Sequence, residues 1–473
     1  MSSPTASSSQ IRLQRLRTGL VFAATAAVVA AAAWMTPRPA PAPRRSPLAS
    51  QGTALLSARL SSGSILRGDH EAYVAITMKA PDAAVTRRAP ASVAIVLDTS
   101  GSMGDENRLE DAKAAAYSLL DKLGPDDELA LITYSTAADT VLPLAYATED
   151  TRAAARRAIA TMTPTGGTNI SGGLGLGADA LTGAHTALRR IVLISDGEPT
   201  EGLGSGITVD PRPLIAFAGR RADQGASITT VGVGLTFRED IMAGIASAGR
   251  GNYYFVERAG DLSAMFAREL GRLGDTMFTA GELALRPGAD VELLEAIGYP
   301  LVRDADGWRV PVADLRRGEQ RKVVLRVKVR ASGTTQDIVA VTWTYRTLSG
   351  AAQQQLAVAR AMVTSDAAEV ERTRDVDALQ LIEQARSSAA LEQASAAFAA
   401  GDGAAANQIL VERRAVLQGY AGTLGKDADK AMLDIQHATD RAERDFADAP
   451  AASAPEGLRA VKGNRAQSYE LAH

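Results

Sequence analysis

The strongest restriction on the fold of this chain comes from an unbroken apolar run that ends in an acid and two hydroxyls. Residues 93–97 read Val-Ala-Ile-Val-Leu, and Asp98, Ser100 and Ser102 follow at alternate positions. A strand buried on both faces of a parallel sheet has such a continuous apolar run. Open α/β sheets place their ligand sites outside the carboxyl ends of the strands. The segment therefore predicts a central parallel strand with a polar site at its end.

The polar residues after this run have the chemistry of a cation site. Asp98, Ser100 and Ser102 form a D-x-S-x-S pattern, and Gly101 allows the turn between them to fold back. Three short oxygen-bearing side chains on one tight loop suit a hard divalent cation, with Mg²⁺ as the first candidate. Mn²⁺ and Ca²⁺ also accept oxygen ligands. The same residue types commonly form a turn and cap a helix, so the pattern alone leaves both interpretations open.

The pattern of apolar residues divides the body of the chain into α/β and all-β parts. Residues 92–275 alternate strand-like runs with helical stretches, which predicts an α/β fold with a doubly wound, mostly parallel sheet. Residues 276–365 alternate with period two, as the half-buried strands of a β-sandwich do. Residues 51–91 contain two shorter strand-like runs, which cannot bury a face alone. We expect them to join the sandwich across the α/β insert.

The beginning of the chain reads as a targeting region. Residues 1–17 are basic and contain no acid, residues 18–35 are apolar, and residues 36–50 form a proline-rich linker. The uncharged part, 19–35, is interpreted as a signal anchor in the membrane or as a cleaved signal peptide. We therefore expect a protein of the cell envelope, membrane-anchored with an extracytoplasmic body, or secreted if this segment is cleaved.

The C-terminal part is predicted to be helical. Residues 366–448 carry an apolar face at helical spacing and predict a small helical bundle. Residues 449–473 are expected to form a flexible tail.

Two later segments add oxygen-bearing side chains at the ends of other elements. A glycine-rich loop over 163–171 places Thr168 just before a helix, and an apolar run over 191–195 ends at Asp196. A capping turn explains the first segment equally well, and an Asp-Gly turn explains the second.

Taken together, D-x-S-x-S, G-G-T-N and S-D-G-x-P resemble the von Willebrand factor type A domain over about 92–275. They match the metal-ion-dependent adhesion site of that family position by position. The flanking sandwich resembles bacterial secreted or membrane-tethered members and, more distantly, inter-alpha-trypsin inhibitor heavy chains. By this resemblance the metal is surrounded by Asp98, Ser100, Ser102, Thr168 and Asp196. The serines and the threonine would be direct ligands, and one or both aspartates would act through water.

The resemblance implies a cation-dependent protein-binding protein, of the kind used in adhesion, and not an enzyme. The partner would supply an Asp or Glu carboxylate to the metal, and the membrane would be contacted through 19–35 if that segment is uncleaved. One alternative is a scaffold or regulatory subunit of a larger envelope complex or ATPase machine. A second is a metal-dependent hydrolase, since a bound metal can activate water.

Composition argues against several other classes of function. The chain has no cysteine and four histidines, which excludes thiolate metal sites and leaves little for histidine catalysis. Its formal net charge is -3, so we expect no nucleic-acid partner. No glycine-rich loop is followed by G-K-S/T, and no G-x-S-x-G segment occurs.

Overall fold

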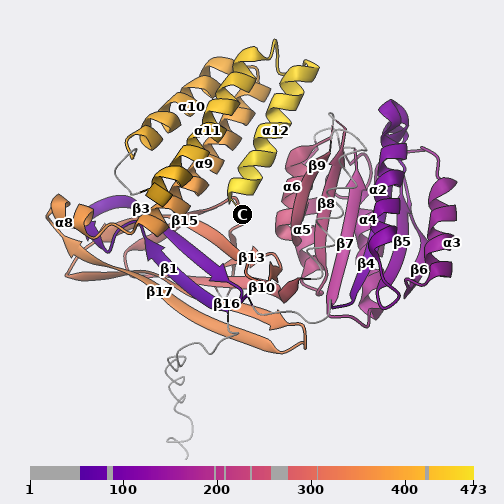
Figure 1. The fold of residues 1–473 in the computed structure, drawn as a ribbon, viewed down its shortest axis with the longest axis horizontal. Coiled ribbons are helices and arrows are strands. Elements are labelled where there is room, and N and C mark those ends of the chain that lie inside the picture. Colours follow the sequence, from indigo (N-terminus) through magenta and orange to yellow (C-terminus); the bar gives the residue numbers. More distant parts are fainter. Residues whose placement is uncertain are drawn as a thin grey trace, which may run out of the picture. The chain divides into compact units, whose positions relative to one another are not determined.

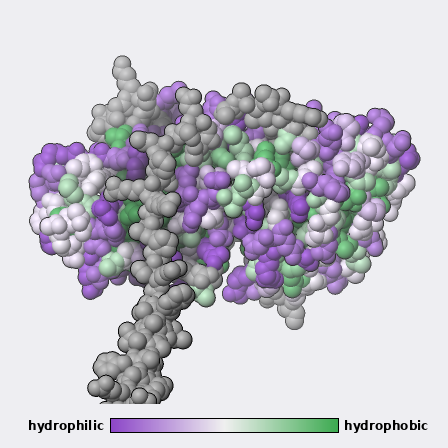
Figure 2. Space-filling view, turned by 90° about the horizontal axis from the view of Figure 1, so that it is seen from below, coloured by the Kyte–Doolittle hydropathy of each residue, from purple (hydrophilic) through white to green (hydrophobic). Residues whose placement is uncertain are grey.

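The structure is a computed structural model of the whole chain. It describes residues 54–82, 89–196, 199–206, 209–234, 237–256, 275–305, 307–420 and 426–472. The apolar segment 19–35, which is predicted to be an anchor or signal, lies outside these residues. Within the described ranges, no helix is both long and apolar enough to cross a membrane. Figure 2 shows hydrophobic and hydrophilic residues interspersed on one face of the molecule.

The α/β part is built on one six-stranded sheet, which confirms the predicted fold class. In sheet order the strands are β6 (Ala138–Tyr146), β5 (Glu128–Tyr134), β4 (Ala91–Asp98), β7 (Leu188–Ser195), β8 (Ser227–Val233) and β9 (Arg250–Val256). All neighbours are parallel except β6, which runs antiparallel to β5. Every residue of β4 is buried, as its continuous apolar run predicts.

Helices cover both faces of this sheet (Figure 1). α2 (Arg108–Lys122) and α3 (Glu149–Ala160) pack on one face. α4 (Ile170–Ala180), α5 (Pro211–Ala222) and α6 (Glu239–Ala248) pack on the other. The glycine run inside α4 permits close approach to the sheet, because a Cβ on Gly173 would lie 2.6 Å from Tyr134.

Two antiparallel sheets form the predicted β-sandwich around one shared core. The first sheet has the order β1 (Leu55–Leu60), β3 (Gly68–Lys79), β15 (Gln320–Ala331) and β11 (Val291–Ile297). The second has the order β12 (Val302–Asp304), β13 (Gly307–Val312), β10 (Thr276–Pro287), β16 (Thr335–Thr347), β17 (Ala352–Thr364) and β2 (Ser64–Leu66), with the short β14 (Leu315–Arg316) on β10. β2 is the exception to the antiparallel pattern, since it pairs with β17 in parallel.

The α/β part is an insert between two strands that pair with each other. β3 precedes the insert and β15 follows it, and they pair from Lys79–Gln320 to Gly68–Ala331. Both ends of the insert meet one turn of the sandwich: the carbonyl of Pro81 accepts from Gly318 N at 3.0 Å, and that of Asp275 accepts from Arg317 N at 2.8 Å. The expected joining of the early strands to the later ones is therefore present.

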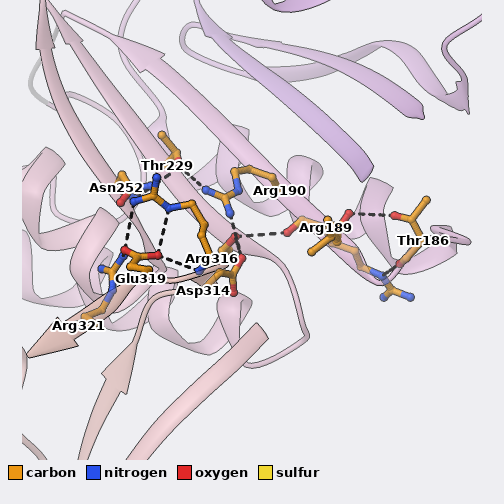
Figure 3. Close-up of polar contacts among 11 residues, drawn as sticks. Thr186, Arg189, Arg190, Thr229, Asn252, Asp314, Arg316, Glu319 and Arg321 are labelled. Atoms are coloured by element: carbon orange, nitrogen blue, oxygen red, sulfur yellow. Dashed lines mark hydrogen bonds and ion pairs between the residues drawn. The ribbon is translucent and has the colours of Figure 1, made fainter. Parts of the chain in front are cut away.

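A buried ion pair ties the insert to the sandwich (Figure 3). Arg190 on β7 donates from Nη2 to Oδ2 of Asp314 at 2.9 Å, and Ser227 Oγ donates to the same oxygen at 3.3 Å. Burial raises the pKa of Asp314, although Arg190 opposes that shift. Close by, Arg316 and Arg321 both donate to Glu319. The insert is thus held to the sandwich by charged side chains as well as by its two connections.

The C-terminal helices form the predicted bundle and extend beyond it. They are α8 (Ala367–Arg372), α9 (Val376–Ala399), α10 (Gly403–Gln418), α11 (Lys426–Asp448) and α12 (Pro455–Ala472). α9 also packs on the first sheet, where Ala378, Ile382 and Ala385 meet Ala75 and Val324.

The prediction of a flexible tail over 449–473 is wrong, because α12 occupies most of it. Its buried residues are mainly small or polar, and they include Ala460 and Ser468. Ser468 Oγ and Ser388 Oγ lie 3.0 Å apart, which brings α12 close to α9. Small residues permit such close helix contact but give little apolar signal in the sequence.

α12 also contacts the α/β insert through charged side chains. Lys462 Nζ donates to the Phe237 carbonyl at 2.9 Å and lies 3.5 Å from the centroid of that ring. Glu239 is 4% exposed; its Oε1 accepts from Tyr253 at 2.8 Å, and Arg465 Nη1 lies 3.7 Å from its Oε2. Burial raises the pKa of Glu239 to about 7 and lowers the pKa of Lys462 to about 8.

We expect Glu239→Gln to flatten the pH dependence of stability between pH 4.5 and about 7. In this range the folded wild type keeps the carboxyl protonated while the unfolded chain releases the proton. The stability contributed by protonation of Glu239 in the folded state is therefore fully present below pH 4.5 and is lost as the pH rises to about 7. The effect should exceed about 1 kcal/mol, since one unit of pKa shift corresponds to about 1.4 kcal/mol. Urea unfolding of both proteins across this range measures it, and equal slopes would contradict it.

Candidate metal site

The candidate site lies where the direction of the sheet connections reverses. From β4 the chain continues through β5 to β6 on one side, and from β7 through β8 to β9 on the other. Asp98 is the last residue of β4, and Asp196 directly follows the neighbouring β7. Ligands of open α/β sheets bind at this reversal, outside the carboxyl ends of the strands.

The D-x-S-x-S loop is held by its own side chains. A 3₁₀ helix, η1 (Gly101–Asn107), begins directly after Ser100. Ser100 N donates to Oδ1 of Asp98 at 2.8 Å, which closes the turn. Ser100 Oγ and Ser102 Oγ lie 3.2 Å apart, and Ser102 Oγ donates to Oδ1 of Asp196 at 2.9 Å. The structure therefore brings four of the five predicted residues into one chain of contacts.

The loop that carries Thr168 is bonded to the D-x-S-x-S loop through main-chain atoms. Gly101 N donates to the Gly166 carbonyl at 3.1 Å, and Thr165 N donates to the Thr99 carbonyl at 2.8 Å. Thr168 is buried, and its main-chain N donates to Thr200 Oγ1 at 2.8 Å. These bonds align the two loops and do not use the Thr168 hydroxyl.

Gly166 is required at its place in the second loop. Its φ of +69° lies in the left-handed region, and a Cβ there would lie 2.5 Å from Thr136 Oγ1. Gly166 also supplies the carbonyl that binds the D-x-S-x-S loop. A glycine at this position therefore serves the alignment of the two loops.

Three residues that the sequence analysis missed complete the hydrogen bonds of the two acids. Ser195 Oγ donates to Oδ2 of Asp98 at 2.6 Å, and the Tyr134 hydroxyl donates to the same oxygen at 3.2 Å. Arg108 Nη1 donates to Oδ2 of Asp196 at 2.7 Å. Tyr134 and Ser195 end the strands on either side of β4, so their places at this edge could have been predicted. Arg108 begins a helix and gave no such signal.

The electrostatics of the site follow from its burial. Asp98 is fully buried, and this burial raises its pKa to about 6, although hydrogen bonds from Ser195 and Ser100 oppose the shift. Burial and the neighbouring Asp98 raise the pKa of Tyr134 well above its ordinary value. All four carboxylate oxygens of Asp98 and Asp196 accept hydrogen bonds from protein donors.

The two serine hydroxyls of this group form a hydrogen bond whose length is also compatible with neighbouring ligands of an octahedral cation. Neighbouring ligands of octahedral Mg²⁺, each at about 2.0–2.1 Å, lie about 3 Å apart. The 3.2 Å separation of Ser100 Oγ and Ser102 Oγ is close to that value. The described residues include no cluster of three or more His, Cys, Asp or Glu placed to hold a metal.

Comparison with known proteins identifies this part of the chain. Residues 93–198 match the model of the von Willebrand factor type A domain. This segment is a von Willebrand factor type A (VWA) domain. The match spans β4 to the residues just after β7, so it includes all five predicted site residues.

Curated relatives share the VWA region and cover part of the chain. The uncharacterized protein sll0103 of Synechocystis sp. is 29% identical over 227 residues, which are 47% of this chain and 51% of that protein. The uncharacterized protein YfbK of Escherichia coli is 28% identical over 185 residues, 38% of this chain and 31% of that protein. Human inter-alpha-trypsin inhibitor heavy chain H4 is 30% identical over 139 residues, which are 28% of this chain and 15% of that protein. The chain thus spans about half, or less, of the length of these relatives.

A solved structure shares the fold over most of the chain. The von Willebrand factor type A protein from Catenulispora acidiphila superposes with a TM-score of 0.66 at 17% identity, covering 90% of this chain and 98% of that one. The ArnB paralog VWA2 from Sulfolobus acidocaldarius superposes with a TM-score of 0.58 at 15% identity, covering 88% of this chain and 99% of that one. At these identities the likeness concerns the fold alone.

Proposed function

We propose that this chain is a cation-dependent protein-binding protein of the cell envelope. The hydroxyls of Ser100, Ser102 and Thr168 would hold one divalent cation, with Mg²⁺ as the first candidate and Mn²⁺ or Ca²⁺ as substitutes. Asp98 and Asp196 would act from outside, through water. The proposal rests above all on the serine pair, which has the spacing of neighbouring cation ligands while both acids already accept hydrogen bonds from protein donors.

This arrangement suits binding of a carboxylate. A cation held by neutral hydroxyls and water keeps most of its positive charge, and Mg²⁺ usually keeps several waters, one of which an incoming ligand can replace. An Asp or Glu of a partner protein can then bind it as a charged ligand, which is stronger than a neutral contact. The VWA domain supports a role in protein–protein interaction. The envelope location is proposed from the apolar segment 19–35, and a partner there would meet the site outside the cytoplasm.

A matched pair of substitutions at Thr168 tests the cation site. Thr168→Val keeps the branched shape and removes the hydroxyl, whereas Thr168→Ser keeps the hydroxyl. We expect the wild type and Thr168→Ser to bind one Mn²⁺, and Thr168→Val to bind it at least about tenfold more weakly, since it loses one inner ligand. Electron paramagnetic resonance of free Mn²⁺ measures this with the full chain.

The partner is tested with the same variants. Proteins captured from envelope extracts by the wild type should be lost on chelation and with Thr168→Val, and retained with Thr168→Ser. Ser349→Ala, on an exposed turn of the sandwich, serves as a control that should change neither result. If Thr168→Val binds Mn²⁺ as the wild type does, the assignment of this cation site is wrong.

A further inference from the structure

A buried arginine contacts one of the two acids of the candidate site. Arg108 Nη1 lies 2.7 Å from Oδ2 of Asp196, and the two side chains are 8% and 0% exposed. The other carboxylate oxygen of Asp196, Oδ1, accepts a hydrogen bond from Ser102 Oγ. The positive charge of Arg108 therefore lies beside the carboxylate that faces the serine pair, and neither group can turn to solvent to avoid the other.

The backbone on both sides holds this arginine in place. Asn107, the last residue of η1 and the N-cap of α2, has a φ of 63° in the left-handed region, directly before Arg108 begins α2. Gly234 follows β8, and a Cβ there would lie 3.1 Å from Arg108 Nε. Gly234 also has a left-handed φ of +84°. A residue with a side chain at 234 would therefore press on the guanidinium group, and glycine leaves room for it.

The charge of the site depends on this contact. If both are ionised, Asp98 and Asp196 carry two negative charges, and Arg108 compensates one of them. Cation sites in proteins tune their affinity by the charge of the surrounding ligands. A divalent cation bound beside this group would leave an excess of positive charge, which a carboxylate from another molecule can compensate.

We propose that Arg108 strengthens the mutual dependence of cation binding and carboxylate binding. In the absence of a partner, the positive charge of Arg108 weakens the binding of the cation. The carboxylate of the partner then supplies the missing negative charge. This inference rests on the proposed function, because it concerns the same cation. Arg108 is thus a residue that sets the affinity of the site without being one of its ligands.

Substitutions that separate charge from shape test this role. Arg108→Met removes the charge at similar length, Arg108→Gln keeps a hydrogen-bond donor for Asp196, and Arg108→Lys keeps the charge. We expect both neutral variants to bind Mn²⁺ alone about tenfold more tightly than the wild type, and Arg108→Lys to bind like the wild type. Electron paramagnetic resonance of free Mn²⁺ measures the affinities, and circular dichroism shows that each variant is folded.

Acetate serves as the carboxylate probe in the same titration. At constant ionic strength, acetate should raise the Mn²⁺ affinity of the wild type and raise that of Arg108→Gln by a smaller factor. If folded Arg108→Gln binds Mn²⁺ no more tightly than the wild type, or gains as much from acetate, the role of Arg108 is overturned while the cation site stands. If Thr168→Val binds Mn²⁺ as tightly as the wild type does, the proposed function and this inference both fail.

Discussion

Replacing Glu383 with alanine is expected to lower the free energy of unfolding by about 3–5 kcal/mol, since it leaves a buried charge without its partner. Glu383 on α9 and Arg413 on α10 are 1% and 6% exposed, and their Oε2 and Nη2 atoms lie 2.5 Å apart. Arg413 Nε also donates to Ser387 Oγ at 2.7 Å. Without the carboxylate, the guanidinium group stays buried between the two helices and keeps only neutral acceptors.

A double substitution separates the loss of the pair from the loss of packing. Glu383→Leu combined with Arg413→Met replaces both charges by apolar side chains, and such replacements of buried pairs are often neutral or stabilising. We therefore expect the double variant to be more stable than Glu383→Ala. Urea unfolding followed by far-ultraviolet circular dichroism compares the proteins. A Glu383→Ala protein within about 1 kcal/mol of the wild type would contradict the prediction.

Trp343→Ala is expected to destabilise the sandwich by a similar amount, about 3–5 kcal/mol, because it opens a large cavity in a packed core. Trp343 is fully buried, and its ring lies 4.2 Å from that of Tyr345 and 6.1 Å from that of Phe278, centroid to centroid. Trp308 is only partly buried against the same core, so Trp308→Ala should cost less. Calorimetric unfolding of both variants measures the difference.

A milder change at the same position checks the cause. Within the described part of the chain, Trp343 Nε1 is buried without a hydrogen-bond partner. Trp343→Phe removes this donor together with part of the ring, so its loss of stability should be well below that of the alanine variant. Equal losses for phenylalanine and alanine would show that cavity volume is not what sets the effect.

The fold class could be predicted because apolar periodicity is a local property of the sequence. The continuous run of β4 and the period-two strands after residue 276 each carry their burial pattern in a few neighbouring residues. α12 was missed for the opposite reason. Its buried side includes Lys462 and Ser468, whose hydrogen-bond partners lie on other elements. Such polar residues do not add to an apolar stripe that the sequence would reveal.

The candidate site shows the same limit. Asp98 and Asp196 could be placed together because both follow apolar strands, and parallel strand ends share one edge. The contact between Arg108 and Asp196 depends on a turn at Asn107 and on the absence of a side chain at Gly234. These residues are distant in the chain and have no shared pattern, so no local rule joins them.

The nesting of the α/β insert within the sandwich also bears on the order in which the protein folds. During synthesis β3 emerges before the whole domain, and its partner β15 emerges after it. The entropic free-energy cost of closing a loop grows by about 0.6 kcal/mol for each doubling of the loop length. Because Pro81 and Asp275 bond to adjacent residues of one turn, a folded domain acts as a short connection between them. We therefore expect the inner domain to fold first on the ribosome, and β3 to remain without β15 until that has happened.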